Sequence, residues 1–65
     1  MTLKEIRESR NLTQRELAAA VGVSHGCVSM WENGQRNLNT KNMHKLAEFF
    51  NIPFLSFVCL MYANR

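Results

Sequence analysis

The chain has 65 residues, of which 46% are hydrophobic, three are glycine and one is proline. This length and composition suit one compact helical domain with a small core, and they leave no room for a buried catalytic cleft. Eight lysines and arginines against five acidic residues give a net charge of +3, which fits either a polyanionic partner or simply a basic surface. No run of about twenty apolar residues occurs, so we expect no membrane-spanning segment.

The capping-box pattern Thr-x-x-Glu occurs twice, beginning at Thr2 and at Thr13. In this pattern the hydroxyl and the carboxylate satisfy backbone N–H groups that are left open at a helix start. The two boxes predict helices over about residues 2–10 and 13–20. The side chains expected to face the core from this part of the chain are Leu3, Ile6, Leu12, Leu17 and Val21.

A third helix is predicted to begin after Ser24, whose hydroxyl serves as its cap, and to run to about Glu32. The dipeptide Asn33-Gly34 is a stop signal, in which Gly34 takes the left-handed conformation at the helix end. The residues that follow, QRNLN, are predicted to form a loop.

A fourth helix is predicted to begin at Asn39 or Thr40, and Pro53 fits the first turn of a fifth. The apolar residues that recur at helical spacing in the fourth helix are Met43, Leu46, Ala47 and Phe50. The chain is therefore predicted to be an all-α domain of five short helices.

Between Gln14 and Asn33, small and apolar residues fall where two helices joined by a sharp turn must pack. A short side chain at Ala18 lets the second helix lie across the first. Gly22 permits a positive φ in the turn, and Val28 anchors the second helix in the core. This is the spacing of a helix-turn-helix.

From about Leu3 to Ile52 the chain resembles the Cro/CI-type repressor family, also called the XRE-like family. The resemblance is carried by LKEIRESRNLTQRELA, VGVSHGCVSMWENG and KLAEFFNI. It implies a lambda-repressor-like domain whose second and third helices form the helix-turn-helix. It also implies a sequence-specific transcriptional regulator of phage or mobile-element type that represses by covering promoter DNA.

We expect no enzyme, since the glutamates are scattered, neither cysteine has a placed base and no glycine-rich loop could cradle a phosphate. An inducer or other small-molecule ligand is not expected either. The second functional interpretation is an antirepressor or antitoxin-like module that acts mainly by binding another protein.

The N-terminal half of the third helix is expected to face base edges in the major groove. By the resemblance, the base-reading positions match His25, Gly26, Ser29 and Met30. His25 can donate to guanine and Met30 can contact a thymine methyl group, whereas Gly26 has no side chain. Specificity is therefore expected to lean on DNA shape. The alternative for His25 is a solvated side chain, while Val28 and Trp31 are expected to pack inward.

A second set of polar residues is expected to contact phosphates at the groove edge, namely Gln14, Arg15, Ser24, Asn33, Gln35, Arg36, Asn39, Thr40 and Lys41. Arg10 is expected to add to the positive field. By the resemblance, Arg7 and Glu32 form a structural ion pair that locks the third helix in place. The cations expected to be merely solvated are Lys4, Lys45 and Arg65.

Cys27 and Cys59 lie far apart and form no metal-type cluster with His25 or His44. With no secretory signal recognised, we expect reduced thiols in the cytoplasm of a bacterial or phage-infected cell, and neither metal nor cofactor. The sequence leaves open whether Cys27 packs in the core or lies on the exposed face of its helix.

Residues 53–65 are assigned as an oligomerisation or partner-binding segment within the single domain 1–65. As a helix, PFLSFVCLMY is apolar nearly all round, and an uncovered apolar stripe usually marks a protein contact. A two-fold homodimer would place two recognition helices about 34 Å apart. The alternatives are contact with another repressor protein, pairing of FVCLMY as a β-strand, and completion of the core. The interface residues predicted are Phe54, Leu55, Phe57, Val58, Met61 and Tyr62.

Overall fold

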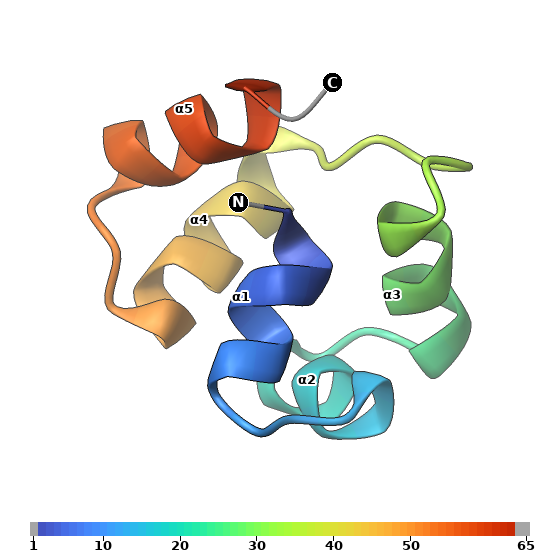
Figure 1. The fold of residues 1–65 in the computed structure, drawn as a ribbon. Helices are drawn as coiled ribbons and strands as arrows, with labels where there is room; N and C mark the ends of the chain where they lie inside the picture. The colour runs from blue at the N-terminus through green and yellow to red at the C-terminus, as the bar shows by residue number, and fades with distance from the viewer. Residues whose placement is uncertain (1, 64–65) are drawn as a thin grey trace.

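The computed structural model describes residues 2–63, which form five α-helices and no strand (Figure 1). The all-α fold class predicted from the sequence is therefore confirmed. Residues 64 and 65, the last two of the assigned segment 53–65, lie outside the described residues, and Arg65, predicted to be solvated, is one of them. The helices are α1 (Leu3–Ser9), α2 (Gln14–Val21), α3 (His25–Glu32), α4 (Thr40–Phe50) and α5 (Phe54–Ala63).

Side-chain caps begin the first four helices where the sequence predicted them. Thr2 and Thr13 each complete a capping box: the hydroxyl accepts from the amide three residues on at 3.1 Å, and that residue's carboxylate accepts from the threonine N–H at 2.8 Å. Ser24 and Asn39 likewise accept from the amide three residues on. The fourth helix thus begins at Thr40, with Asn39 as its cap.

Among residues 2–63, four adopt the left-handed conformation that turns the chain after a helix. Gly22 (φ 74°) and Gly34 (φ 75°) do so as predicted. Asn11 (φ 57°) and Asn51 (φ 58°) do so as well, because asparagine tolerates this region better than most residues. These tight turns keep the connections between the helices short.

The core draws side chains from all five helices. Ala18 and Val28 occupy the buried crossing positions predicted for the helix-turn-helix, and Trp31 packs inward as expected. Leu12, predicted to face the core, is only partly buried and packs against its edge. The buried hydrophobic residues are Leu3, Ile6, Leu17, Ala18, Val21, Val28, Trp31, Leu46, Ala47, Phe50 and Phe57.

The C-terminal segment is helical in α5, so the β-strand alternative is wrong. Phe57 is fully buried in the core, which corrects its prediction as an interface residue, because one stripe of the helix packs against α4. Leu55 is 76% exposed and Tyr62 is 56% exposed, so the segment does not simply complete the core. The other predicted interface residues are half-buried: Phe54, Val58 and Met61.

Pro53 lies just before α5 rather than in its first turn, and its carbonyl accepts from the Phe57 N–H at 2.9 Å. The Phe54 ring stacks on His44 of α4, with ring centroids 3.7 Å apart. Within the described residues, no single helix is long and apolar enough to cross a membrane. The α4–α5 pair meets the length and composition test only together, with a bend of 112° between the two helices.

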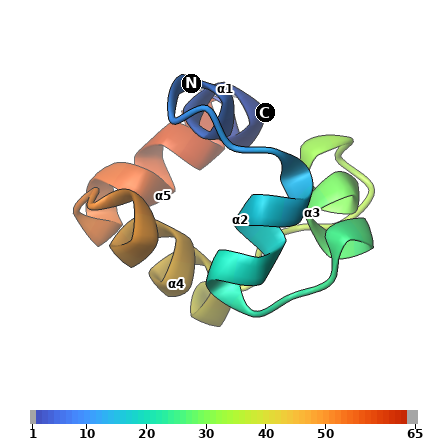
Figure 2. The same ribbon diagram turned by 90° about the horizontal axis from the view of Figure 1, so that it is seen from below.

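Figures 1 and 2 place α3 on one side of the bundle and α5, beside α4, on the other. The C-terminal end of α5 nevertheless reaches the end of α3, because Met61 and Tyr62 line one recess with Trp31, Glu32 and Arg36.

Candidate nucleic-acid interface

The turn between α2 and α3 sets the angle at which α3 crosses α2. Gly22 takes the left-handed conformation, and the Val23 N–H donates to the Ala18 carbonyl at 3.0 Å. Ala18 and Val28 are buried, at 3% and 0% exposure, where α2 and α3 pack together. A small residue, a glycine turn and a buried anchor thus produce the predicted helix-turn-helix.

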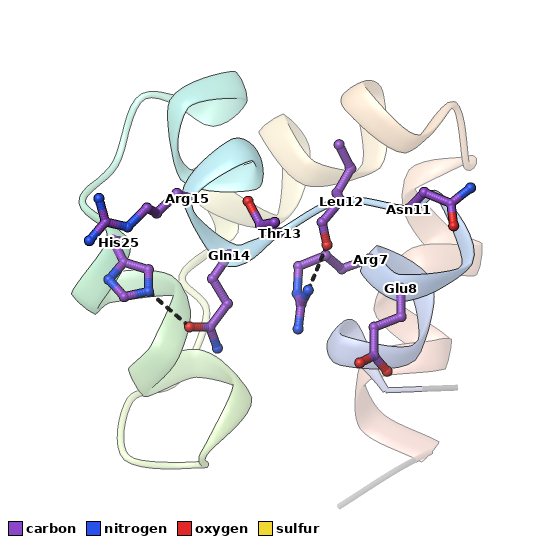
Figure 3. A pocket seen from close by; sticks show the side chains of 8 residues that line it. All are labelled: Arg7, Glu8, Asn11, Leu12, Thr13, Gln14, Arg15 and His25. Atoms are coloured by element: carbon purple, nitrogen blue, oxygen red, sulfur yellow. Dashed lines mark hydrogen bonds between the residues drawn. The ribbon is translucent and has the colours of Figure 1, made fainter.

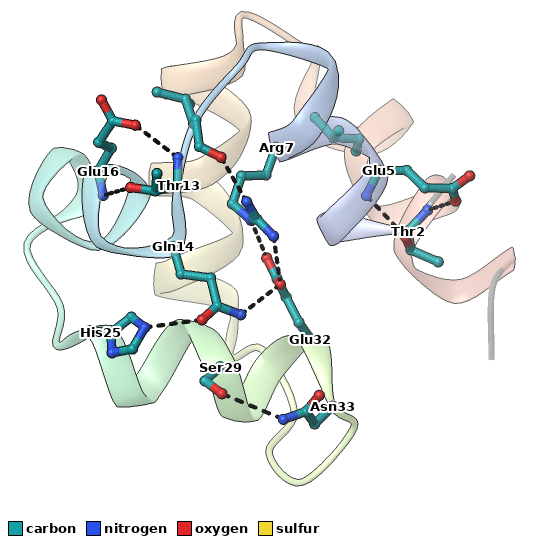
Figure 4. A network of polar contacts seen from close by, with 12 residues as sticks. Thr2, Glu5, Arg7, Thr13, Gln14, Glu16, His25, Ser29, Glu32 and Asn33 are labelled. Atoms are coloured by element: carbon teal, nitrogen blue, oxygen red, sulfur yellow. Dashed lines mark hydrogen bonds and ion pairs between the residues drawn. The ribbon is translucent and has the colours of Figure 1, made fainter.

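A buried ion pair fastens the end of α3 to α1 (Figure 4). Arg7 donates to Glu32 through Nε at 2.7 Å and through Nη2 at 3.1 Å, a two-point contact between a planar guanidinium and a carboxylate. The remaining nitrogen, Nη1, donates to the Leu12 carbonyl at 2.6 Å. The two charged side chains are only 9% and 2% exposed. Arg7 and Glu32 thus form the pair that the sequence predicted, and they hold α3 to both α1 and the α1–α2 connection.

Both members of this pair stay ionised. Burial alone would raise the pKa of Glu32, but hydrogen bonds from Arg7 and Gln14 and the charge of Arg7 together hold that pKa below the ordinary value of 4.5. The hydrogen bond to Glu32 raises the pKa of Arg7. A charged pair this well shielded from water is costly to break by removing one partner.

Gln14 extends the network from the end of α3 to its beginning. Its Nε2 donates to Glu32 Oε1 at 2.9 Å, and its Oε1 lies 3.0 Å from His25 Nε2. Gln14 therefore bridges the last and first residues of α3 (Figure 4). The second N–H of its amide has no partner among the described residues, and this leaves a donor for the phosphate contact predicted at this position.

The outer face of α3 carries the four residues predicted to read bases. His25 and Gly26 are exposed, and Ser29 and Met30 are half-exposed. A side chain added at Gly26 would meet no atom within 4 Å, so this part of the face is open. Ser29 Oγ accepts from Asn33 Nδ2 at 3.4 Å. Cys27 is partly buried against the core, which matches its divided assignment.

Beside this face, an open polar recess of about 500 Å³ lies between the α1–α2 connection and the start of α3 (Figure 3). Figure 3 shows Arg15 and His25 at one end of the recess and Arg7 and Glu8 at the other, with the side chain of Gln14 between them. The lining residues are Arg7, Glu8, Asn11, Leu12, Thr13, Gln14, Arg15 and His25. The recess is a concave polar surface at the N-terminal ends of two helices.

The other residues predicted to contact phosphates surround α3 without forming one cluster. Gln35 and Arg36 lie in the loop after α3, which is folded back because both backbone N–H groups donate to the Met30 carbonyl, at 2.9 and 3.3 Å. The side-chain oxygens of Ser24 and Asn39 are engaged as caps. The exposed members of the set are Arg15, Ser24, Asn33, Gln35, Arg36, Asn39, Thr40 and Lys41.

Arg10, expected to add to the positive field, is exposed and lies over the Phe50 ring with its guanidinium carbon 5.5 Å from the ring centroid. Cys27 and Cys59 are free thiols. No group of three or more His, Cys, Asp or Glu residues in the described part of the chain is placed to hold a metal ion.

The sequence did not reveal the bridge made by Gln14 or the contact of Arg7 with the Leu12 carbonyl. The Gln14–His25 contact could have been predicted from the motif, because a helix-turn-helix brings the N-termini of its two helices close together. A long amide at the first position of α2 then faces a polar ring at the first position of α3. Neither contact follows from spacing within a single helix.

The helix-turn-helix family model matches residues 3–57, and the chain belongs to this family of XRE-type domains. The predicted resemblance is confirmed. Members of this class place the second helix of the motif in the major groove of double-stranded DNA, and the family is one of DNA-binding regulators.

Three relatives illustrate the range of the family. The chain is 32% identical to antitoxin PezA of Streptococcus pneumoniae over 86% of its length, which is 35% of PezA. It is 41% identical over 75% of its length to an HTH-type transcriptional regulator of Archaeoglobus fulgidus, and covers 69% of that protein. It is 29% identical over 86% of its length to the cryptic phage CTXphi transcriptional repressor RstR of Vibrio cholerae, and covers 50% of it. The chain thus spans about a third of PezA and half of RstR.

Proposed function

We propose that the protein is a sequence-specific DNA-binding transcriptional regulator that inserts α3 into the major groove. The observation that carries this proposal is the open outer face of α3, with His25, Gly26, Ser29 and Met30, on a helix whose two ends are fixed by the Arg7–Glu32–Gln14–His25 network. An α-helix fits the major groove, and a helix fixed at both ends enters it in one orientation.

Base reading is assigned to His25, Gly26, Ser29 and Met30 on this face. His25 and Ser29 supply polar atoms, and Met30 supplies an apolar contact suited to a thymine methyl group. Because the open position of Gly26 offers no side chain, we assign part of the specificity to the shape and deformability of the DNA.

Phosphate contacts are assigned to residues that flank α3. The recess beside the start of α3 suits a DNA strand, since Gln14 and Arg15 line it and can donate to phosphate oxygens. On the other side of α3, the loop and the start of α4 offer further donors. These residues are Ser24, Asn33, Gln35, Arg36, Asn39, Thr40 and Lys41.

Repression by a homodimer that covers promoter DNA is the form of regulation we favour. Leu55 and Tyr62 leave apolar surface exposed on α5, and burying it in a two-fold contact would leave the outer face of α3 open to DNA. The similarity to the phage repressor RstR supports assignment to a Cro-type repressor of a phage or mobile element.

A second candidate is an antitoxin-like or antirepressor module whose main partner is another protein. It is favoured by the similarity to antitoxin PezA and by the same exposed surface at Leu55 and Tyr62. This candidate predicts a tight protein complex and no sequence-specific footprint on DNA.

Selection of bound sequences from random duplexes tests the proposal. His25→Ala should relax the preference at one base position, because it removes one base contact. Arg36→Ala should weaken binding to all sequences alike and lower the slope of log K against log salt by about one, because it removes one phosphate contact. Lys45→Ala, an exposed cation on α4 outside the proposed interface, is the matched control. Recovery of no enriched sequence would contradict the proposal, as would identical behaviour of the first two variants.

A further inference from the structure

The polarity of one side-chain amide in the network is dictated by its neighbours. The Glu32 carboxylate is ionised and held by Arg7, so it can only accept hydrogen bonds. The Gln14 group facing it at 2.9 Å must therefore be the NH₂, which leaves the Gln14 carbonyl facing the His25 ring. Reversing the amide would place its oxygen against the carboxylate.

The imidazole of His25 is constrained by its neighbour in the same way. A carbonyl oxygen 3.0 Å from His25 Nε2 requires that Nε2 carry the hydrogen and donate it. In a neutral ring the other nitrogen, Nδ1, is then an acceptor. Nδ1 has no hydrogen-bond partner within residues 2–63, and the side chain is exposed at the start of α3.

We propose that the buried Arg7–Glu32 pair, acting through Gln14, fixes His25 in its Nε2–H form, so that the recognition helix offers the DNA an acceptor at this position. His25 is then a specificity-determining residue and Gln14 a positioning residue. The DNA part of this inference rests on the proposed function, whereas the state of the ring does not.

An acceptor at His25 favours bases that present a hydrogen-bond donor in the major groove. The hydrogen-bond donors in the major groove are the exocyclic amino groups, N6 of adenine and N4 of cytosine. Guanine N7 and O6 and thymine O4 only accept. A neutral His25 held in this form therefore favours adenine or cytosine at its contact and disfavours guanine. This is the reverse of the donation to guanine expected from the residue type alone.

The network runs from a shielded ion pair to an exposed ring. The links from Arg7 to Glu32, from Glu32 to Gln14 and from Gln14 to His25 measure 2.7, 2.9 and 3.0 Å. The Arg7 and Glu32 side chains are 9% and 2% exposed, so water does not readily replace either partner. The charge of the Glu32 carboxylate thus determines, through Gln14, which ring nitrogen of His25 carries the hydrogen.

The ring can be observed without DNA. The chain has two histidines, so nitrogen-15 spectra at about pH 8, where imidazole side chains are neutral, contain two sets of ring signals, and His44→Gln assigns them. We expect the His25 Nδ1 signal in the unprotonated range and Nε2 in the protonated range. In Gln14→Met, which keeps the length but removes both polar atoms, both signals should move toward the average of two exchanging forms. A protonated Nδ1 in the wild type, or unchanged signals in Gln14→Met, would overturn the inference.

Selection from random duplexes at about pH 8 tests the consequence. The wild type should bind guanine at the His25 contact about tenfold more weakly than the best base, and Gln14→Met should reduce that ratio to about threefold or less. Gln35→Met, a glutamine outside the network and predicted to contact phosphate, should weaken binding without changing the base preference. A wild-type preference for guanine at this contact would overturn the inference. If no variant selected any sequence, the proposed function would fail, while the ring signals would still decide the state of His25.

Discussion

The outer helices α3 and α5 both bury apolar side chains, but α3 is also fastened by a charged pair. On one side α3 is fastened at both ends by directional hydrogen bonds, from Arg7 and Gln14 to Glu32 and between Gln14 and His25. On the other side α5 is held through the fully buried Phe57. Apolar packing is not directional, so it tolerates small shifts that a charged pair does not.

The two helices also differ in the side chains that they leave exposed. The helix α3 buries Val28 and Trp31 on its inner face, and its outer face carries His25, Gly26, Ser29 and Met30. The helix α5 has more apolar surface than so small a domain can cover, and Leu55 and Tyr62 remain 76% and 56% exposed. We therefore associate α3 with DNA and α5 with protein contact.

The largest expected effect lies on the apolar side. Phe57→Ala removes a fully buried ring and should cost about 3–5 kcal/mol of unfolding free energy. The matched control Leu55→Ala, two residues earlier on the exposed stripe, should cost less than about 0.5 kcal/mol. Urea denaturation followed by far-ultraviolet circular dichroism measures both at a protein concentration at which the chain is monomeric. Equal losses would contradict the assignment of the two stripes.

Breaking the polar side should cost nearly as much. Arg7→Ala leaves the Glu32 carboxylate shielded from water without its partner, and the expected loss is about 3 kcal/mol. Breaking a buried ion pair by removing one partner costs about 3–5 kcal/mol, and we expect the lower value because the Arg7 side chain keeps 9% exposure. Lys45→Ala, which removes an exposed cation from α4, should change stability by less than about 0.5 kcal/mol. A loss below about 1 kcal/mol for Arg7→Ala would indicate a pair no stronger than one on the surface.

The polar side should also respond to acid. The folded-state pKa of Glu32 lies below its ordinary value of 4.5, so the folded state holds its proton less tightly than the unfolded state. The resulting stabilisation is fully present above about pH 4.5 and is lost as pH falls through the lowered folded-state pKa. In thermal melts across this range, Glu32→Gln should show a flatter decline than the wild type.

Glu5→Gln is the control for this measurement. Glu5 also has a lowered pKa, through its hydrogen bonds with Thr2, but it lies exposed at the start of α1. The steep acid decline assigned to Glu32 should persist in this variant. If Glu5→Gln flattened the profile and Glu32→Gln did not, the acid response would belong to the helix cap.

The smallest effect on stability should accompany a large effect on association. Leu55→Lys combined with Tyr62→Lys places charges on the exposed stripe of α5 and should leave the monomer folded, with its unfolding free energy changed by less than about 1 kcal/mol. Sedimentation at low micromolar concentration should show a wild-type dimer and a monomeric variant. A wild-type monomer, both alone and with its selected DNA, would contradict the homodimer.

Local chemistry made much of this fold predictable. Capping boxes at Thr2 and Thr13 and the glycine turn at Gly22 act within a few residues of chain, and the structure forms them where the pattern indicated. The pair of Arg7 and Glu32 was predicted from the family resemblance, since 25 residues separate its members and no local rule joins them.

What the sequence did not reveal depends on tertiary context. Phe57 and Leu55 are both large apolar residues, and a helix that is apolar nearly all round carries no pattern to show which stripe packs on α4. Asn51 ends α4 in a conformation that glycine usually adopts, so composition alone did not mark it. The Gln14–His25 contact exists only because α2 and α3 cross, and the hydrogen on His25 follows from that contact.

The most direct test of the central claim is a map of the surface that DNA touches. In nitrogen-15 and carbon-13 correlation spectra recorded with a duplex chosen by selection, the largest shift changes should occur at His25, Gly26, Ser29 and Met30. A shuffled duplex of equal length should leave these four signals nearly unchanged while still perturbing the flanking cations. Changes concentrated at Leu55 and Tyr62, or no difference between the two duplexes, would contradict the claim that α3 reads the sequence.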